Sequence, residues 1–317
     1  MKSGPVGVLI MAYGSAPSLD DQAISDYLRH ILQYYRKAEP TEEECRHLKE
    51  RYQAIGGSPL YRITEDLSQA LQNTLDKRFP ERFQVYWGMK HSPPLIEDVV
   101  SQMAKDGVKQ AIAMALAPFR SRLSTAGYYR LVQESNNSLD DPIQWSFAED
   151  WNLHPLFLEL WRNRIEDILH RQEKPPTVIF TNHSLPARIQ EWNDPYADQF
   201  EEAAKAVAKL CRLSRWTIAY QSEGAGSEPW LGPNLTDRLQ ELQEQGQESF
   251  LVAPIGFLMD HLEILYDLDL KAQEKAKEMG VVLSRTEMPN DDPLLVAMLA
   301  DLVEEKIKIS QSPEGAA

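Results

Sequence analysis

Residues 178–183 read Val-Ile-Phe-Thr-Asn-His, and residues 8–13 read Val-Leu-Ile-Met-Ala-Tyr. Each run is short, apolar and free of helical periodicity, which is typical of a buried strand in a parallel sheet. Each run ends in a residue with a titratable ring, His183 in one case and Tyr13 in the other. A later strand of each half also ends in Ala-Pro, at residues 117–118 and 253–254. These matches indicate that the chain contains two copies of one α/β unit.

Eight apolar runs alternate with longer stretches of helical period. The expected strands cover residues 6–12, 83–87, 110–117, 143–147, 177–181, 216–220, 250–255 and 281–284. The expected helices cover residues 20–36, 41–53, 63–77, 95–105, 126–136, 156–171, 196–212, 234–245, 260–278 and 292–308. Strands separated by helices predict parallel sheets with right-handed crossovers. The fold class is therefore α/β, with two similar Rossmann-like lobes, each a four-stranded parallel sheet flanked by helices.

The domain organisation follows from this division. We expect an N-terminal lobe over residues 1–150, with a helical insertion near 20–77, and a C-terminal lobe over 151–309, which contains His183 and a group of carboxylates that are candidates for handling a metal. Residues 310–317 are small and polar, which predicts a disordered tail. Ligands of doubly wound sheets bind at the carboxyl ends of strands, so two facing lobes would form one cleft.

Composition excludes several classes of protein. The chain has 317 residues, of which 43% are hydrophobic and 26% charged, and its net charge is -15. A net negative charge of this size opposes nonspecific binding to nucleic acid or to an anionic membrane. Cys45 and Cys211 have no ligand-like spacing, which argues against a zinc module or an iron-sulfur cluster. The longest apolar run, residues 111–119, is about half of what a membrane span needs, so we expect a cytoplasmic protein.

A histidine and a group of carboxylates follow two strands of the second half. His183 ends one strand, and Asp260, Glu263 and Asp267 follow another with i, i+3, i+7 spacing, which places them on one face of the expected helix. A solvated face with Asp260 as N-cap is the plain alternative. Glu263 lies among apolar neighbours, where a carboxylate needs a partner or a raised pKa. Together with His183 it can bind a divalent metal or move protons near neutral pH.

Motifs spread along the whole chain resemble those of the ferrochelatase family. They are Met11-Ala12-Tyr13-Gly14, Arg51-Tyr52, Ile55-Gly56-Gly57-Ser58-Pro59-Leu60, Gly88-Met89-Lys90-His91, Leu116-Ala117-Pro118, His183-Ser184-Leu185-Pro186, Gln221-Ser222-Glu223, Pro229-Trp230-Leu231-Gly232-Pro233, Asp260-His261-Leu262-Glu263 and Glu287-Met288-Pro289-Asn290. The resemblance covers residues 6–308. It implies a chelatase-type fold and a lyase that inserts ferrous iron into a porphyrin, held between two lobes, in haem biosynthesis.

The resemblance also assigns roles to residues. It implies that His183 and Glu263 are the catalytic, metal-handling pair on one face of the macrocycle. In the branch that metallates coproporphyrin III, the tyrosine at the end of the first strand coordinates iron from the opposite face, and Tyr13 matches it. The other substrate-binding candidates are Arg51, Tyr52, Ser58 and Tyr128, which match that branch, and Arg29 and Arg36, which do not match by position.

Three positions depart from the family pattern. Leu32 stands where a propionate-binding arginine is expected, and Phe119 stands where a histidine usually follows the Ala-Pro step. Nearby Arg120 and Arg122 are alternative carboxylate-binding residues. Lys271 replaces an acidic residue, which puts a second, outer metal site in doubt.

These observations favour insertion of iron into coproporphyrin III to give coproheme. Protoporphyrin IX is the alternative substrate. A more distant alternative is that the chain is a non-catalytic haem- or metal-binding protein. Cobalt and nickel chelatases share the fold but usually rely on paired histidines, whereas here His183 pairs with Glu263. We expect no tightly bound cofactor, no nucleic-acid or membrane partner, Fe2+ and porphyrin as substrates, and a monomer that contacts other haem-pathway enzymes transiently.

Overall fold

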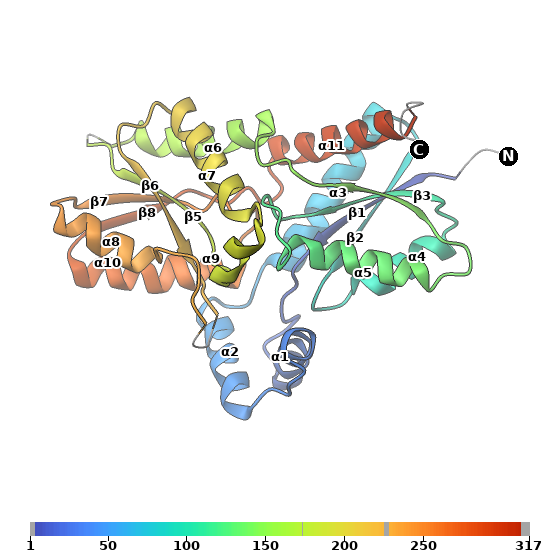
Figure 1. Ribbon diagram of the computed structural model, residues 1–317, viewed down its shortest axis with the longest axis horizontal. Helices are drawn as coiled ribbons and strands as arrows, with labels where there is room; N and C mark the ends of the chain where they lie inside the picture. Colours follow the sequence, from blue (N-terminus) through green and yellow to red (C-terminus); the bar gives the residue numbers. More distant parts are fainter. Residues whose placement is uncertain (1–3, 173, 225–227, 312–317) are drawn as a thin grey trace. The chain divides into compact units, whose positions relative to one another are not determined.

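A computed structural model describes residues 4–172, 174–224 and 228–311, and it divides the chain into two compact units (Figure 1). Unit 1 contains the chain up to Leu116, together with Ser124–Glu149 and the segment from Asn290 onward. Unit 2 contains Ala117–Leu123 and Asp150–Pro289. Each unit is an α/β structure with its own parallel sheet.

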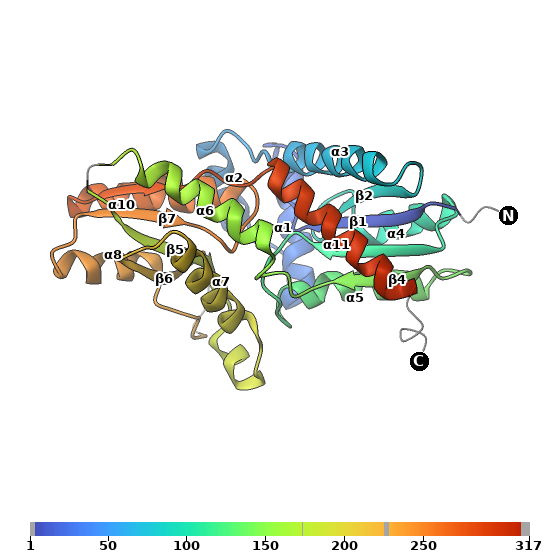
Figure 2. The same cartoon turned by 90° about the horizontal axis from the view of Figure 1, so that it is seen from above.

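Unit 1 is built on four parallel strands in the order β2-β1-β3-β4. They are β1 (Val6–Ala12), β2 (Phe83–Met89), β3 (Gln110–Ala115) and β4 (Gln144–Ala148). The helices that flank this sheet are α3 (Leu60–Arg78) and α11 (Pro293–Gln311) on one face, and α4 (Ile96–Lys105) and α5 (Thr125–Asn137) on the other (Figures 1 and 2). Of the insertion predicted near residues 20–77, α1 (Asp21–Arg36) and α2 (Glu42–Ala54) pack on each other, whereas α3 packs on the sheet as a flanking helix.

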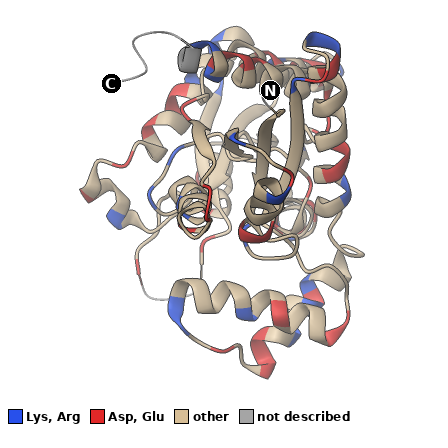
Figure 3. Ribbon diagram, turned by 90° about the vertical axis from the view of Figure 1, so that its right-hand side faces the viewer, with Lys and Arg blue, Asp and Glu red and all other residues tan. Residues whose placement is uncertain are grey.

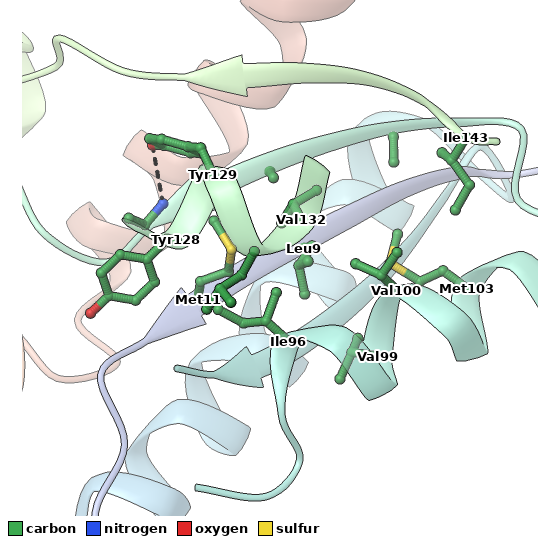
Figure 4. Close-up of a cluster of buried hydrophobic side chains, with 14 of the residues drawn as sticks. Leu9, Met11, Ile96, Val99, Val100, Met103, Tyr128, Tyr129, Val132 and Ile143 are labelled. Carbon is green, nitrogen blue, oxygen red and sulfur yellow. Dashed lines mark hydrogen bonds between the residues drawn. The ribbon is translucent and has the colours of Figure 1, made fainter. Parts of the chain in front are cut away.

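The core of unit 1 explains why β1 is central. Residues 8–11 are fully buried, because helices cover the sheet on both faces. Figure 4 shows the cluster on one face, to which β1 contributes Leu9 and Met11 and helices α4 and α5 contribute Ile96, Val99, Val100, Met103 and Val132. Burying a side chain of this size contributes about 1.5–3 kcal/mol. At the edge of the cluster the Tyr129 hydroxyl donates to the Ala148 carbonyl at 2.9 Å.

Unit 2 repeats the same topology, with strand order β6-β5-β7-β8. The strands are β5 (Thr177–His183), β6 (Trp216–Gln221), β7 (Ser249–Ala253) and β8 (Val282–Arg285). Its helices are α6 (Pro155–Leu169) and α7 (Tyr196–Leu210) on one face, and α8 (Leu235–Glu244) and α10 (Gln273–Met279) on the other (Figure 1). In both units the strand order is second, first, third, fourth, which confirms the predicted pair of similar four-stranded lobes.

The ends of the predicted lobes need correction. The segment from Asn290 onward was expected in a lobe over residues 151–309, but it belongs to unit 1. There α11 packs on α3 and β4, because its apolar face, including Leu295 and Leu299, is buried. Arg78 of α3 also pairs with Asp301 at 2.5 Å. Of the predicted tail, residues 310 and 311 end α11, and residues 312–317 lie outside the described residues.

The single helix expected over residues 260–278 is divided into three parts. A short helix, α9 (Leu262–Leu265), is followed by a π-helical segment, Asp267–Ala272, and then by α10. A π-helical segment has more residues per turn than an α-helix and changes which side chains share a face. The predicted single face of three carboxylates is therefore wrong, and each carboxylate has a different partner.

Acidic and basic residues are interspersed along the helices, while the strands are mostly uncharged (Figure 3). Over the residues that the structure describes, no helix combines the length and apolar character needed to cross a membrane.

Candidate metal-handling site

His183 is the last residue of β5, and hydrogen bonds fix its backbone and its ring. Its N–H donates to the Asn182 side chain at 2.9 Å, and its carbonyl accepts from the Tyr196 hydroxyl at 2.9 Å. The ring Nδ1 lies within hydrogen-bond distance of the Ser184 carbonyl, so Nδ1 carries the donated proton. This contact leaves Nε2 directed at Glu263.

Glu263 lies in α9 between two imidazoles. Its Oε1 is 3.3 Å from Nε2 of His183, and its Oε2 is 3.5 Å from Nε2 of His261. The Nδ1 of His261 is 2.8 Å from the Met259 carbonyl, so this ring is also oriented by backbone. The His183 and Glu263 side chains are 30% and 31% exposed, which leaves the pair open to a ligand. The structure thus brings together the two residues predicted to handle metal.

The charges of the pair reinforce each other. Burial alone would lower the pKa of His183, but the Glu263 carboxylate outweighs it, and the pKa of His183 is raised. Burial would likewise raise the pKa of Glu263, but His183 and then His261 lower it well below the ordinary range. Both groups therefore favour their charged forms. A divalent cation that displaces the Nε2 proton of His183 is stabilised by the same Glu263 carboxylate. The pair is therefore suited to exchanging a proton for a metal ion.

The neighbouring carboxylates have hydrogen-bond partners of their own. Asp260 accepts from Arg285 at 3.4 Å, and Arg285 also pairs with Asp269 at 2.7 Å. Asp267 accepts from the Ser222 hydroxyl at 2.6 Å. The Lys271 ammonium lies 5.4 Å from the centre of the Tyr266 ring. Across the described ranges no cluster of three or more His, Cys, Asp or Glu residues has the geometry of a metal site.

Unit 1 presents Tyr13 immediately after β1. Its side chain is 39% exposed, and its ring meets the edge of the His91 ring with a centroid separation of 4.6 Å. The Nδ1 atoms of His91 and His30 are 3.1 Å apart, so one of them donates to the other. Burial, followed by the charge of Lys90, lowers the pKa of His91 to about 2, and this ring is neutral. Tyr13 is thus supported by a neutral imidazole and remains accessible.

Next to His91, the Lys90 ammonium is buried among tyrosines. The residue is 1% exposed, and its Nζ is 3.0 Å from the Tyr35 hydroxyl. The same atom lies 4.5 Å from the ring centre of Tyr34 and 5.2 Å from that of Tyr128, distances typical of cation–π contacts. Burial and then the charge of Arg130 lower the pKa of Lys90 to about 7. This arrangement fixes the end of β2 against α1 and α5.

The other residues predicted to bind substrate lie in the helices of unit 1. Tyr52 is buried, and its hydroxyl lies 3.0 Å from the Ser15 hydroxyl and accepts from the Ala16 N–H at 3.2 Å. It therefore anchors α2 to the loop after β1. Ser58 accepts from the Leu60 N–H at 3.3 Å at the start of α3, and Arg51 precedes Tyr52 on α2 and is partly buried. Tyr128 forms part of the surroundings of Lys90.

Arg29 and Arg36 lie on α1, the first partly buried and the second exposed. Arg29 pairs with Asp26 at 2.5 Å and with Glu39 at 2.9 Å, as a surface ion-pair network would. A role for either arginine in holding a propionate stays a prediction, as do the substrate-binding roles of Arg51, Tyr52, Ser58 and Tyr128.

Leu32 and Phe119, the two residues that depart from the family pattern at expected binding positions, both lie in the core. Leu32 is buried in α1, and Phe119 is 1% exposed in unit 2, where its ring packs on Phe200 at 5.6 Å. Arg120 pairs with Asp150 at 2.9 Å. The position at which the resemblance implied a histidine is thus occupied by an aromatic side chain that packs in the core.

Sequence reasoning gave no role to His261, Gln221 or Lys90, although each lies in a quoted motif. His261 was identifiable in principle, because it stands two residues before Glu263. The contacts of Gln221 and Lys90 depend on residues distant in sequence, and no local pattern predicts them.

Solved structures with the same fold are metal chelatases. SirB from Bacillus subtilis, with Fe3+, superposes with a TM-score of 0.61 at 10% identity and covers 97% of each chain. CbiX, described as the terminal enzyme of siroheme biosynthesis in denitrifying bacteria, superposes with a TM-score of 0.55 at 12% identity over 94% of this chain and 98% of its own. At such low identity the likeness shows the fold, which is that of the two-lobed chelatases.

Sequence comparison gives the family. The ferrochelatase family model matches residues 5–307. A ferrochelatase of Herpetosiphon aurantiacus is 40% identical over 95% of this chain and 99% of its own length. The coproporphyrin III ferrochelatase of Geobacillus thermodenitrificans is 39% identical over 96% of each, and that of Oceanobacillus iheyensis is 38% identical over 97% and 99%. The chain belongs to the ferrochelatase family.

The buried amine predicts a pH dependence of stability. The pKa of Lys90 is about 7 in the folded protein and about 10.5 when the chain is unfolded. Between these values the unfolded chain binds a proton that the folded protein does not, so stability rises with pH by up to about 1.4 kcal/mol per pH unit. We expect this contribution to be absent in Lys90→Met. Urea unfolding of both proteins from neutral to alkaline pH checks this, and parallel stability profiles would contradict it.

Proposed function

We propose that this protein inserts Fe2+ into coproporphyrin III to give iron coproporphyrin in haem biosynthesis. The observation that carries the proposal is the contact of 3.3 Å between His183 and Glu263, a cation-accepting pair in a chain of the ferrochelatase family. The curated relatives that bear the name coproporphyrin III ferrochelatase support the choice of porphyrin.

Metallation requires two changes at the porphyrin centre. Two pyrrole N–H protons must leave as the ring nitrogens bind Fe2+, and the ion must lose bound water. Once its Nε2 proton has left, the His183 imidazole can accept a pyrrole proton or hold the ion briefly, and Glu263 supplies the countercharge in either case. Because Nδ1 of His183 is committed to the Ser184 carbonyl, the exchange takes place at Nε2. The two released protons balance the charge of the incoming ion.

Coproporphyrin carries four carboxylates and protoporphyrin two, so the choice between them depends on cationic and polar groups around the ring. Our proposal assigns propionate and macrocycle contacts to Arg51, Ser58 and Tyr128, with Arg29 and Arg36 as further candidates. A cytoplasmic, monomeric enzyme with no tightly bound cofactor, in transient contact with other haem-pathway enzymes, completes the proposal.

The substrate assignment predicts a clear preference. At one Fe2+ concentration without oxygen, we expect coproporphyrin III to be metallated at least about 10-fold faster than protoporphyrin IX, because a well-placed hydrogen bond between arginine and a carboxylate contributes roughly 1–3 kcal/mol. Protoporphyrin lacks two of the carboxylates that can accept such bonds. The decrease of the free-base absorption bands measures both rates. The control is His183→Ala, which should abolish insertion and retain porphyrin binding. Faster metallation of protoporphyrin would overturn the assignment.

Tyr13 is assigned as the axial ligand of iron in the product. Its exposed side chain, held on the neutral His91 ring, supports this role. We expect Tyr13→Phe to remove the phenolate-to-iron charge-transfer absorption of bound ferric coproheme. Visible spectra of ferric coproheme bound to the wild-type protein and to Tyr13→Phe test this expectation. Tyr86→Phe is the matched control, because the Tyr86 hydroxyl donates to Asp106. A spectrum unaltered by Tyr13→Phe would exclude Tyr13 as a ligand.

A further inference from the structure

We propose that Gln221 is a positioning residue that sets the separation between His183 and Glu263. The inference rests on the proposed function of that pair as the site of metal entry. Gln221 is the last residue of β6, and it is buried, with 6% of its surface exposed. It acts through hydrogen bonds to the backbone and to the chain segments that carry the two side chains.

The backbone of Gln221 holds the His183 side of the site. In the parallel pairing of β5 and β6, Gln221 is the register partner of His183. Its carbonyl accepts from the Ser184 N–H at 2.8 Å. Ser184 also provides the carbonyl that orients the His183 ring. The position of this imidazole is therefore coupled to the end of β6.

The side chain of Gln221 connects the two halves of the pair. Its Oε1 accepts from the Thr181 hydroxyl at 2.8 Å, and Thr181 lies two residues before His183 on β5. Its Nε2 donates to the backbone carbonyl of Glu263 at 3.4 Å. One buried amide thus bonds both the strand that delivers the imidazole and the turn that delivers the carboxylate. An apolar side chain of the same length fills the space but makes neither bond.

The next residue adds a connection to the π-helical segment that follows α9. Ser222 has a φ of 58°, a left-handed conformation that is uncommon for a residue other than glycine. Its hydroxyl donates to the Asp267 carboxylate at 2.6 Å, four residues beyond Glu263. Strained conformations of this kind persist where the surroundings determine them, and they concentrate at functional sites. The end of β6 therefore bonds both α9, through the Glu263 carbonyl, and the π-helical segment, through Asp267.

The separation maintained in this way suits a divalent ion. Borderline divalent metals bind nitrogen and carboxylate oxygen at about 2.1 Å. Two ligands at that distance, with an angle between about 90° and 109° at the ion, lie about 3.0–3.4 Å apart. The Nε2–Oε1 distance of 3.3 Å falls within this interval. The separation of the two atoms therefore already matches that of two ligands on one ion, and our proposal is that Gln221 maintains this separation.

Cobalt binding to the full-length protein, without porphyrin, tests the proposal. Co2+ bound to the site is measured by its visible absorption, and the part of the signal that His183→Ala removes defines the site. We expect Gln221→Met to weaken this binding about 10-fold, because removing a residue that orients metal ligands commonly costs 10–100-fold in affinity. In turnover, the KM for Fe2+ should rise while the KM for porphyrin stays unchanged.

Gln199→Met is the matched control. Gln199 is another buried glutamine of unit 2, and its amide accepts from the Arg120 N–H at 2.7 Å and donates to Asp150 at 2.6 Å. Urea unfolding should show similar losses of stability in both variants, with cobalt affinity lowered only by Gln221→Met. Unchanged affinity in Gln221→Met, an equal loss in Gln199→Met, or no His183-dependent signal would overturn the proposal. Because no porphyrin is present, a wrong assignment of the porphyrin substrate leaves this result intact.

Discussion

The contact between the His183 imidazole and the Glu263 carboxylate is the interaction on which the account of this protein depends. An isolated charge at a partly buried position is unfavourable, and here each group supplies the charge that the other needs. The backbone carbonyl of Ser184 fixes which ring nitrogen faces the carboxylate. The pair therefore has one geometry and one free coordinating nitrogen, and a divalent ion can replace a single proton.

The fold produces that contact through the ends of parallel strands. His183 ends β5, an inner strand of unit 2, and Glu263 lies in α9, which follows the neighbouring strand β7, so the strand order brings both residues to the same edge of the sheet. The net charge of -15 gives no guide to this site. The nearby carboxylates Asp260 and Asp267 are engaged by Arg285 and Ser222, which leaves Glu263 as the one that contacts His183.

Sequence reasoning recovered what depends on local periodicity and on strand ends. The eight strands, the doubled topology and the approach of His183 to Glu263 were all predictable, because apolar period and strand order determine them. The helix over 260–278 was predicted wrongly, since nothing in the local pattern marks the π-helical segment, which is bonded by Ser222, just after β6, and by Arg285 at the end of β8. The docking of α11 on unit 1 and the burial of Lys90 among tyrosines also depend on contacts distant in sequence.

Anomalous diffraction from crystals soaked with Co2+ tests the central claim most directly, because it locates the ion without relying on turnover. The account predicts an anomalous peak about 2.1 Å from both Nε2 of His183 and a carboxylate oxygen of Glu263, with the Nδ1 contact to Ser184 retained. It also predicts that the peak disappears in His183→Ala. A bound cobalt ion that contacts neither side chain, or one that persists in His183→Ala, would contradict it.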